Sequence, residues 1–456
     1  MKVSTDKDLI EKFLTRGVEK IYPSKNFLED KLNDGKKLRI YLGIDPTGPT
    51  LHLGHAIILA KLKEWQELGH EVVLLIGSFT GMIGDPTDKI ATRKTLTRAE
   101  VLANAKKYKK QAANFIKFSG NNPAKIVYNH KWLEKLNFKE VVNLASKITV
   151  QRMMERDMFE KRMYGEIECP NCGDWSSAKN TMQFYNNEQY AFLHENELIN
   201  CLKCMNRFKP ADAKFRKPAP IYLHEFLYPL MQGYDSVVLN TDGEIGGNDQ
   251  TFNMLTGRDL MKSILNKEKF VITMKLLVDP TGVKMGKTTG NMITMEDEPK
   301  EMYGKVMSWP DTLIISAFEI CTRVDKNECE RIETEIKNNA NPRDYKMRLA
   351  CEIVAIYYGE KKAKEAEENF IKMFQKKETP EEVKSQKSKV KSMNIVELLV
   401  EFNLAKSKGE ARRLIEQGGI KIAGEVIKDI NKIIEIPKDG VLVQRGKRQF
   451  IKVIKE

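Results

Sequence analysis

The chain has 456 residues, of which 41% are hydrophobic and 30% are charged, and its formal net charge is +13. This composition is typical of a soluble globular protein, and no apolar run is long enough to cross a bilayer, which excludes a membrane-spanning helix. The length allows two to four domains, each with a core of its own. The positive charge suits a polyanionic partner, although a lysine-rich solvated surface explains it as well.

The first residues, Met1 to Asp8, are polar and include acidic side chains. A secretory signal needs an apolar core, and a transit helix is rich in arginine and poor in acidic residues. Because neither pattern occurs here, we expect a cytoplasmic protein.

The first part of the chain predicts alternating helices and strands. Residues 8–33 follow an amphipathic helical pattern, and the apolar run 38–44 is typical of a short buried strand. Two prolines and a glycine within 45–50 favour a turn. Helical periodicity then extends from 54 to 68, and residues 71–77 predict a second strand, which completes a strand, helix, strand unit.

Two later apolar runs, 125–129 and 236–240, extend this alternation. Strands that alternate with helices predict an α/β fold with a doubly wound parallel sheet and helices on both faces. Beyond about residue 296 the pattern becomes helical. The basic, serine-rich stretch 384–392 is typical of a linker, and a compact α+β module of residues 393–456 follows it.

The tetrapeptide His52-Leu53-Gly54-His55 follows the first strand and turn and opens the next helix. Free backbone N–H groups and the positive end of the helix dipole favour phosphate at such a position. His52 and His55 are three residues apart, so both can donate hydrogen bonds to phosphate oxygens from one helix face. Gly54 leaves room for a flat base. Two ordinary surface histidines are the alternative, but the placement after a strand and turn favours a nucleotide site.

A second motif, Lys284-Met285-Gly286-Lys287-Thr288, could supply two cations from a glycine-containing loop. Activation of a carboxylate by ATP needs such charges, because the transition state at the α-phosphate carries extra negative charge and the carboxylate is already a nucleophile. Taken alone, the motif could equally be a lysine-rich solvated turn.

Two pairs of cysteines, Cys169 with Cys172 and Cys201 with Cys204, form two CxxC knuckles separated by 28 residues. Four thiolates with this spacing are typical of a closed, structural zinc site. Free thiols or a redox pair are the alternative, and disulfides are less favoured in a reducing compartment.

Five segments resemble the bacterial-type tyrosyl-tRNA synthetases in order and spacing. They are Asp45-Pro46-Thr47 with His52-Leu53-Gly54-His55, Gly81-Met82-Ile83-Gly84-Asp85-Pro86, Tyr228 with Gln232-Gly233-Tyr234-Asp235, Gly246-Gly247-Asn248-Asp249-Gln250, and Lys284-Met285-Gly286-Lys287-Thr288. The resemblance implies a class I enzyme with a Rossmann-like catalytic domain. Such an enzyme condenses L-tyrosine with ATP and Mg2+ to tyrosyl-adenylate, then transfers tyrosine to the 3′ end of tRNA(Tyr). The lysine motif departs slightly, because Gly286 and Thr288 stand where many class I enzymes have serine.

The resemblance also implies which residues bind tyrosine. Tyr41 and Asp235 would flank the substrate hydroxyl. The ammonium group would be held by Asp85, Tyr228 and Gln232, and the carboxylate would be approached by Gln250. The sequence supports part of this assignment independently, since positions 228, 232 and 235 share one helical face. Ordinary core and helix-cap roles are the alternative for each of these side chains.

For ATP, the resemblance implies contacts from both motifs. Thr47, His52 and His55 would meet phosphate or ribose, and Lys284 and Lys287 would act during catalysis. Further ATP contacts are implied for Asp45, Gly54, Gly247, Asp249 and Lys287.

The resemblance suggests four parts of the chain: a catalytic domain over 1–295, a helical anticodon-region domain over 296–383, a linker over 384–392 and an RNA-binding domain over 393–456. The cysteines fall in an insertion over about 163–217 of the connective segment. Because this segment commonly forms the subunit interface in the family, we expect a homodimer bridged by tRNA.

The last module resembles a small RNA-binding domain found in a ribosomal small-subunit protein and in pseudouridine synthases. Lys406, Lys408, Arg412 and Arg413 cluster at one edge of its predicted helix, where they could bind RNA phosphates. The module has 13 Lys and Arg against 9 Asp and Glu, so its excess of 4 positive charges is modest. A solvated helix face is the alternative.

Two other functions share these features. A related enzyme that activates tryptophan or another aromatic amino acid would keep the ATP motifs. The pair Tyr41 and Asp235 favours a substrate with a hydroxyl group and counts against this alternative. An RNA-binding or splicing scaffold could keep the fold without catalysis, but it would have no reason to keep His52, His55 and the two lysines.

Overall fold

The computed structural model describes residues 2–85, 96–179, 182–185, 189–192, 198–201, 203–278, 292–374, 385–388, 390–446 and 449–456. These residues form two compact units. The first consists of Met1–Asp297 with Ser308–Leu349, and the second of Glu298–Met307 with Ala350–Glu456. Part of the expected helical domain, 308–349, therefore belongs to the unit that contains the large sheet.

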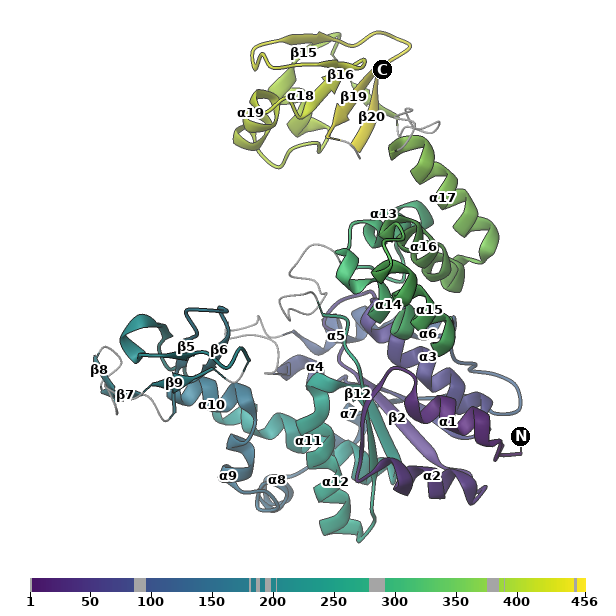
Figure 1. The fold of residues 1–456 in the computed structure, drawn as a ribbon, viewed down its shortest axis with the longest axis vertical. Coiled ribbons are helices and arrows are strands. Elements are labelled where there is room, and N and C mark those ends of the chain that lie inside the picture. The colour runs from purple at the N-terminus through teal and green to yellow at the C-terminus, as the bar shows by residue number, and fades with distance from the viewer. Residues whose placement is uncertain are drawn as a thin grey trace. The chain divides into compact units, whose positions relative to one another are not determined.

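A six-stranded sheet lies at the centre of the first unit (Figure 1). In spatial order its strands are β1 (Val18–Tyr22), β13 (Phe270–Met274), β12 (Gly243–Gly247), β2 (Arg39–Ile44), β3 (Glu71–Ile76) and β4 (Lys125–Tyr128). β1 is antiparallel to β13, and all other neighbours are parallel. The chain runs outward from β2 to β4 and then returns to the other side of β2. Strand order thus reverses between β2 and β12, where open parallel sheets bind ligands beyond the carboxyl ends of their strands.

Helices cover this sheet. α3 (Leu53–Glu67) connects β2 to β3 and buries Leu59, Leu62 and Trp65, and α11 (Leu223–Leu239) and α12 (Thr251–Leu265) pack against each other. A Cβ atom at Gly233 would lie only 3.2 Å from the Cα of Gly257, so these glycines permit a close approach of α11 and α12. The other helices are α1 (Lys7–Thr15), α2 (Lys25–Asn33), α4 (Thr80–Ile83), α5 (Arg98–Ala105), α6 (Tyr108–Ala112), α7 (His130–Leu133), α8 (Phe138–Ala145), α9 (Val150–Met154) and α10 (Asp157–Tyr164).

Two predicted elements were wrong. The helical pattern of 8–33 is interrupted by β1, because Gly17 adopts a positive φ of 66° and turns the chain into the sheet edge. The strand predicted at 236–240 is the last turn of α11, which ends where Asn240 takes a left-handed conformation. Val237 packs among helical residues, Leu239 packs against side chains of β2 and β3, and Val238 is exposed. The strand of this region is instead the glycine-rich β12.

The expected insertion forms a small β module. β5 (Glu166–Glu168) pairs with β6 (Trp175–Ser177) and β11 (Lys214–Arg216), and β9 (Ile199–Asn200) pairs with β10 (Arg207–Phe208). A separate hairpin is formed by β7 (Met182–Tyr185) and β8 (Gln189–Phe192). The core of the module is small and contains two of the cysteines: Ile167, Cys169, Cys201 and Phe208.

The expected helical region is confirmed over residues 299–374. Its helices are α13 (Pro299–Met307), α14 (Ile314–Cys321), α15 (Lys326–Lys337), α16 (Pro342–Tyr358) and α17 (Glu360–Phe374). In the described part of the chain, no helix is both long and apolar enough to cross a membrane.

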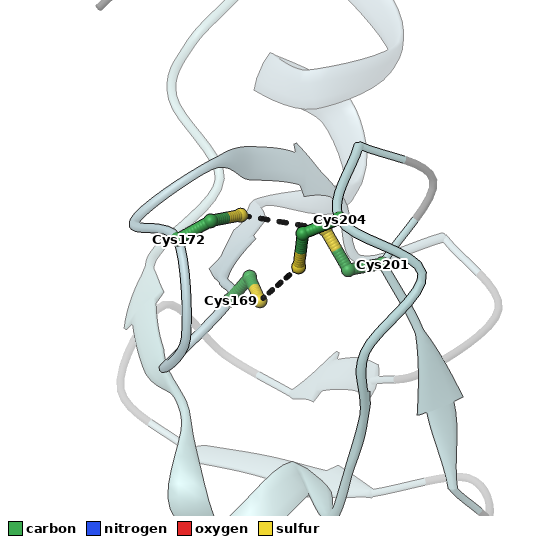
Figure 2. Close-up of side chains that lie close together, drawn as sticks. All are labelled: Cys169, Cys172, Cys201 and Cys204. Atoms are coloured by element: carbon green, nitrogen blue, oxygen red, sulfur yellow. Dashed lines mark hydrogen bonds between the residues drawn. The ribbon is translucent and has the colours of Figure 1, made fainter.

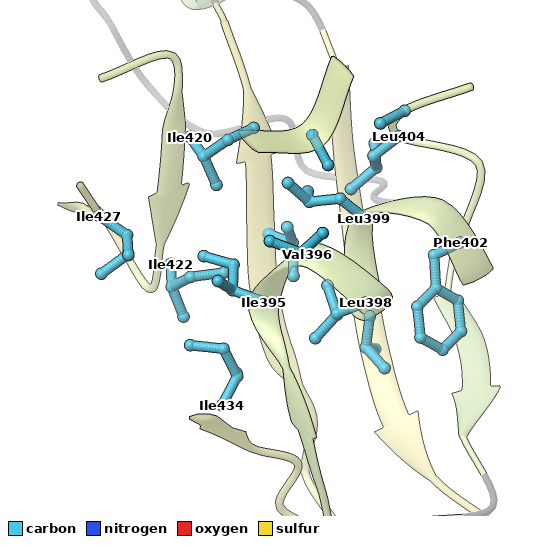
Figure 3. Packing of buried hydrophobic residues seen from close by; sticks show 14 of the residues in the cluster. Ile395, Val396, Leu398, Leu399, Phe402, Leu404, Ile420, Ile422, Ile427 and Ile434 are labelled. Carbon is cyan, nitrogen blue, oxygen red and sulfur yellow. The ribbon is translucent and has the colours of Figure 1, made fainter. Parts of the chain in front are cut away.

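The C-terminal module is an α+β domain, as predicted. A five-stranded sheet has the order β14 (Ser385–Ser388), β20 (Gln449–Lys455), β19 (Val441–Arg445), β16 (Ile420–Ile422) and β17 (Glu425–Val426). β15 (Ser392–Asn394) pairs with β18 (Ile433–Glu435), and the helices are α18 (Ile395–Glu401) and α19 (Lys408–Glu416). Figure 3 shows the apolar core that these elements share.

The strand β14 corrects the prediction of a linker over 384–392. Ser385–Ser388 pair in parallel with Lys452–Lys455, so backbone hydrogen bonds add this polar segment to the sheet. Composition indicated a linker because the stretch is basic and rich in serine. In the structure, three of the four residues of β14 are exposed.

Candidate active site

A cavity of about 600 Å³ lies at the carboxyl ends of β2 and β12, where the strand order reverses. All thirteen predicted tyrosine and ATP residues that belong to the described chain line it. They are Tyr41, Asp45, Thr47, His52, Gly54, His55, Asp85, Tyr228, Gln232, Asp235, Gly247, Asp249 and Gln250. The fold therefore brings side chains from separate sequence segments to one cleft.

Asp235 is a deeply buried carboxyl group of the cleft, with 2% of its surface exposed. One of its oxygens accepts a hydrogen bond from Trp132 Nε1 at 2.7 Å, and the other accepts one from Asn129 Nδ2 at 3.2 Å. Burial raises the pKa of Asp235 well above its usual range, while these two hydrogen bonds oppose the shift. The carboxyl group is therefore held rigidly from the side of β4.

Tyr41 points from β2 toward helix α11. Its hydroxyl lies 2.9 Å from Ser236 Oγ and 3.3 Å from the main-chain oxygen of Gln232. Burial, assisted by the negative charges of Glu244 and Asp235, raises the pKa of Tyr41 well above its usual range. The phenol therefore remains protonated and can donate a hydrogen bond.

Asp45, at the turn after β2, is fixed by two hydroxyl groups. Thr80 Oγ1 donates to one carboxylate oxygen at 2.6 Å, and Tyr228 OH donates to the other at 2.9 Å. The residue opposite must be glycine, because a Cβ atom at Gly77 would lie 1.8 Å from Asp45 Oδ1. Tyr228 from α11 is thereby tied to the end of β2.

Asp85 pairs with Arg156 and Gln250. Arg156 Nη2 donates to one oxygen of Asp85 at 2.9 Å, and Gln250 Nε2 donates to the other at 2.8 Å. Arg156 is only 6% exposed. Sequence reasoning expected Asp85, Tyr228 and Gln232 around one ammonium group, and the structure places all three in the cavity lining but gives each a different protein partner.

The two histidines lie at the start of α3, with ring centroids 3.9 Å apart. The backbone N–H of His52 donates to Nδ1 of His55 at 3.2 Å. A Cβ atom at Gly54 would lie 3.0 Å from the His52 ring, so the glycine leaves space for this close arrangement. Burial, with the neighbouring His52, lowers the pKa of His55 well below its usual range.

The lysine motif with Lys284 and Lys287 lies outside the described residues, but both flanks of that segment reach the cleft. Leu276 and Leu277 line the cavity on one side, and Met292 and Ile293 line it on the other. The second flank is bonded to the histidine motif, because Leu53 N–H donates to Ile293 O at 2.9 Å.

Comparison with known proteins identifies the family. The class I tRNA synthetases (W and Y) match residues 33–170 and 177–375, and the tyrosine–tRNA ligase SYY-like C-terminal domain matches residues 375–453. The tyrosine–tRNA ligase of Thermotoga maritima is 41% identical over 97% of this chain and 96% of its own length. That of Carboxydothermus hydrogenoformans is 40% identical over 97% of both. The chain belongs to the tyrosine–tRNA ligases.

Solved structures agree on the fold. A C-terminally truncated mitochondrial tyrosyl-tRNA synthetase from Aspergillus nidulans has a TM-score of 0.57 at 20% identity and covers 81% of this chain and 95% of its own. A tyrosyl-tRNA synthetase from Archaeoglobus fulgidus, complexed with L-tyrosine, has a TM-score of 0.54 at 19% identity and covers 79% of this chain and 100% of its own. The expected family, fold class and enzyme class are thus confirmed.

Sequence reasoning missed the residues of this ligase that form hydrogen bonds to the carboxyl groups of the cleft. Asn129 and Trp132 support Asp235, and Thr80 supports Asp45. The position of residues 129–132 could have indicated this role, because they directly follow β4. The carboxyl ends of parallel strands lie at the same edge of a sheet, where ligands bind. Ser236 and Glu244 were also missed, although they lie next to the motifs at 232–235 and 246–250.

The four cysteines of the insertion converge on one point (Figure 2). Their sulfur atoms all lie within 4.8 Å of one another, and Cys169 is 3.7 Å from Cys204 while Cys172 is 3.6 Å from Cys201. These distances exclude disulfide bonds, whose sulfurs are about 2.05 Å apart. Hydrogen bonds from Asn171 and from the Asn206 backbone lower the pKa of the Cys204 thiol to about 6, which favours a thiolate.

Both knuckles have the same backbone pattern. The N–H of Cys169 donates to the carbonyl of Asp174, five residues on, at 2.8 Å, and the N–H of Cys201 donates to that of Asn206 at 2.9 Å. In each loop the residue four positions after the first cysteine has a positive φ: 69° at Gly173 and 58° at Met205. Two similar turns therefore present the two cysteine pairs.

In the C-terminal module, the four predicted cationic residues are exposed on and before α19. Lys408 forms an ion pair with Glu397 at 2.9 Å, in which both side chains remain more than half exposed. A further cation, Arg445, is paired with Glu410. The sequence prediction of an exposed basic helix edge agrees with this arrangement.

Proposed function

We propose that the cleft at the carboxyl ends of β2 and β12 is where this ligase activates tyrosine with ATP. The observation that carries the proposal is the buried pair Tyr41 and Asp235, a phenol and a carboxyl group each fixed by protein hydrogen bonds. A buried polar pair of this kind suits a substrate with a phenolic hydroxyl, because a phenylalanine ring offers neither an acceptor to Tyr41 nor a donor to Asp235. The cleft should therefore favour tyrosine over phenylalanine.

In this proposal Tyr41 donates to the substrate hydroxyl and Asp235 accepts from it. Tyr228, Gln232 and Asp85 line the same cavity and would bind the ammonium group, and Gln250 would approach the carboxylate. Binding of the ammonium group by Asp85 requires rearrangement of its contacts with Arg156 or Gln250.

The substrate carboxylate would attack the α-phosphate of ATP·Mg2+. An oxygen–phosphorus bond forms to the carboxylate, and the bond to the β-phosphate breaks with release of pyrophosphate. His55 Nδ1 accepts a hydrogen bond, so in the neutral ring the proton is on Nε2, which can donate to a phosphate oxygen. Thr47, His52 and the N-terminus of α3 would assist it, and Lys284 and Lys287 would stabilise the added negative charge.

For the nucleoside, Asp45, Gly54, Gly247 and Asp249 line the cavity beside the histidines. A Cβ atom at Gly247 would lie 2.4 Å from Asp249 Oδ1, so glycine at this position lets the Asp249 carboxylate lie against the backbone at the cavity wall. By resemblance to the family, Gly247 and Asp249 would lie near the ribose.

Transfer to tRNA(Tyr) would use the C-terminal module. Lys406, Lys408, Arg412 and Arg413 are exposed and lie within eight residues of one another, which suits contact with backbone phosphates. Such contacts position the RNA and add little sequence discrimination.

The cysteine cluster suits a structural zinc ion held by Cys169, Cys172, Cys201 and Cys204. A tetrahedral ion with zinc–sulfur bonds of about 2.3 Å would place its ligands about 3.8 Å apart, close to the two sulfur separations described above. When bound, zinc would cross-link the two knuckles, because two of its ligands come from each of them.

A homodimer is supported by exposed apolar side chains in the connective segment. Phe138 is 83% exposed and Val142 is 51% exposed, one turn apart on α8, and Val150 at the start of α9 is 67% exposed. Adjacent apolar residues of this size are typical of a protein interface.

The experiment that tests the proposed function is amino-acid-dependent exchange of ATP with labelled pyrophosphate, without tRNA. Exchange stimulated by tyrosine alone supports the cleft assignment. Exchange with tryptophan would overturn the roles of Tyr41 and Asp235, and no exchange with any amino acid would favour an RNA scaffold.

A further inference from the structure

A buried ion pair lies behind the tyrosine side of the cleft. Lys269 immediately precedes β13, and Glu244 belongs to β12, where it is the register partner of Tyr41 in β2. The lysine side chain is 0% exposed and the glutamate side chain 2% exposed, and the Lys269 ammonium contacts Glu244 Oε2 directly. Glu244 lines the cavity.

The pair is connected to two groups of the proposed tyrosine site. Gln232 Nε2 donates to the other oxygen of Glu244 at 2.9 Å. Lys269 Nζ donates to Ser236 Oγ at 2.9 Å, and the same oxygen is 2.9 Å from the hydroxyl of Tyr41. One buried charge pair thus reaches both a side-chain amide and a phenol of the cleft wall.

The site of the ammonium group is shaped to receive it. A Cβ atom at Gly257 of α12 would lie 2.6 Å from Lys269 Nζ and 2.8 Å from Ser236 Oγ. The ammonium therefore occupies the space that a side chain would fill between α11 and α12. Any residue larger than glycine at position 257 would displace it.

The donors and acceptors around Ser236 limit the directions of these hydrogen bonds. Lysine can only donate, so Ser236 must accept from it, and repulsion by the ammonium turns the serine hydrogen away, toward Tyr41 or Glu244. When Ser236 donates to the Tyr41 oxygen, the hydrogen of Tyr41 is available to another acceptor. In this structure that acceptor is the main-chain oxygen of Gln232, 3.3 Å away. Gln232, whose amide nitrogen is taken by Glu244, directs its amide oxygen elsewhere.

We propose that Lys269 and Glu244 are positioning residues for tyrosine recognition: they orient the Tyr41 hydroxyl as a donor and the Gln232 amide oxygen as an acceptor. This inference rests on the proposed function of the cleft. It assigns a role to two residues that act on the substrate through their neighbours.

The energetics favour a role beyond stability. Burial of both charges is costly, and an apolar pair of similar volume is often as stable or more stable. Burial also lowers the pKa of Lys269, which Glu244 opposes. The buried pair therefore contributes little to stability. Its fixed charges can instead orient the hydrogen-bonding groups of Tyr41 and Gln232.

The test is a double variant, Lys269→Met with Glu244→Met, which removes both charges and leaves neither one unpaired. ATP–pyrophosphate exchange is measured with tyrosine and with phenylalanine, and thermal unfolding confirms the fold. We expect kcat/KM for tyrosine to fall roughly 10–100-fold, mostly through KM, and that for phenylalanine to change about twofold or less. A merely structural role would lower both values in parallel.

The matched control is Lys61→Met with Glu64→Met, since Lys61 is also buried and paired with a glutamate but lies outside the cleft lining. We expect it to leave discrimination unchanged. If the cleft double variant does not fold, Ser236→Ala interrupts the connection between Lys269 and Tyr41 with little change in volume. It should raise KM for tyrosine several-fold while the Tm remains close to that of the unaltered chain.

The outcomes separate this inference from the proposed function. If the unaltered chain shows no tyrosine-dependent exchange, the proposed function fails and this inference fails with it. If the unaltered chain exchanges with tyrosine, and the folded variants still prefer tyrosine over phenylalanine to the same degree, only the positioning role of Lys269 and Glu244 is overturned.

Discussion

The cleft around Asp235 and the cysteine module position their polar side chains in different ways. In the cleft, Asp235 accepts from Trp132 and Asn129, which are 103 and 106 residues away in sequence. In the module, Cys169 and Cys201 are presented by turns whose hydrogen bonds close within five residues. The cleft therefore depends on the correct assembly of the whole sheet, whereas each knuckle depends on its own loop.

This difference implies different weaknesses. The cleft has many protein partners for each polar group, so one substitution should change recognition and leave the fold intact. Among the described residues, the core cluster of the module has four buried side chains, so the order of the module should depend on what joins the four sulfurs.

The largest effect should come from the module. Cys169→Ser with Cys201→Ser removes two of four ligands, and structural zinc sites contribute apparent binding free energies of about 10–16 kcal/mol. We expect zinc to fall from one equivalent to near zero, with rapid hydrogen exchange over 166–177 and adenylate formation largely kept. Elemental analysis and hydrogen exchange check this, with Cys351→Ser as the control because it lies outside the cluster. Purified unaltered chain without zinc would contradict the metal proposal.

A smaller effect should come from the cleft. Trp132→Phe removes the indole N–H that donates to Asp235 at 2.7 Å and leaves a buried carboxyl oxygen without this donor, at a cost of about 1–3 kcal/mol. We expect kcat/KM for tyrosine to fall by about 10- to 100-fold in pyrophosphate exchange. Trp175→Phe is the control, since that indole stacks on Arg216 in the cysteine module. Equal losses in both variants would refute a local role for Trp132.

The sheet should also respond to pH through His70. This side chain is fully buried, its Nδ1 accepts from Leu38 N–H, and burial lowers its pKa from 6.5 to about 4. Because the unfolded chain binds the proton first, the contribution of His70 to stability is complete above about pH 6.5 and is lost as the pH falls toward 4.

Denaturant unfolding at several pH values checks this expectation. His70→Asn keeps an acceptor for Leu38 but cannot titrate, so its free energy of unfolding should decline less between pH 6.5 and 4 than that of the unaltered chain. Parallel curves would show that other groups cause the decline. A chelator, by contrast, should affect the cysteine module and leave this pH dependence unchanged.

The smallest effect should come from the exposed helix edge of the C-terminal module. Arg412→Ala with Arg413→Ala removes two exposed cations, so stability should change by less than about 0.5 kcal/mol. We expect KM for tRNA to rise several-fold and its salt dependence to weaken, while tyrosine activation is unchanged. Lys438→Ala, an exposed cation elsewhere in the module, is the control. Unaltered tRNA charging would move the RNA contact to another surface.

The fold was predictable where apolar pattern and turn signals agreed. β2, β3 and β4 lie within the predicted strands, and α3 begins at the histidine motif. β12 was missed because its sequence, Gly-Glu-Ile-Gly-Gly, has only one apolar side chain, and its strand state comes from pairing with β2 and β13. The reverse error at 236–240 arose because a short apolar run fits a buried helix as well as a strand.

The sequence by itself determined the order of motifs, the four cysteines and the identity of the residues that line the cleft. Spacing along a helix fixes which side chains share a face, as at positions 228, 232 and 235, and the resemblance to the family implied the other cleft residues. Only the tertiary structure decided which partner each polar group has. Tyr41 meets Ser236 across 195 residues, and Asp45 meets Thr80 across 35. Such partners depend on which strands become neighbours in the sheet. The pattern of residues along the sequence does not specify this pairing.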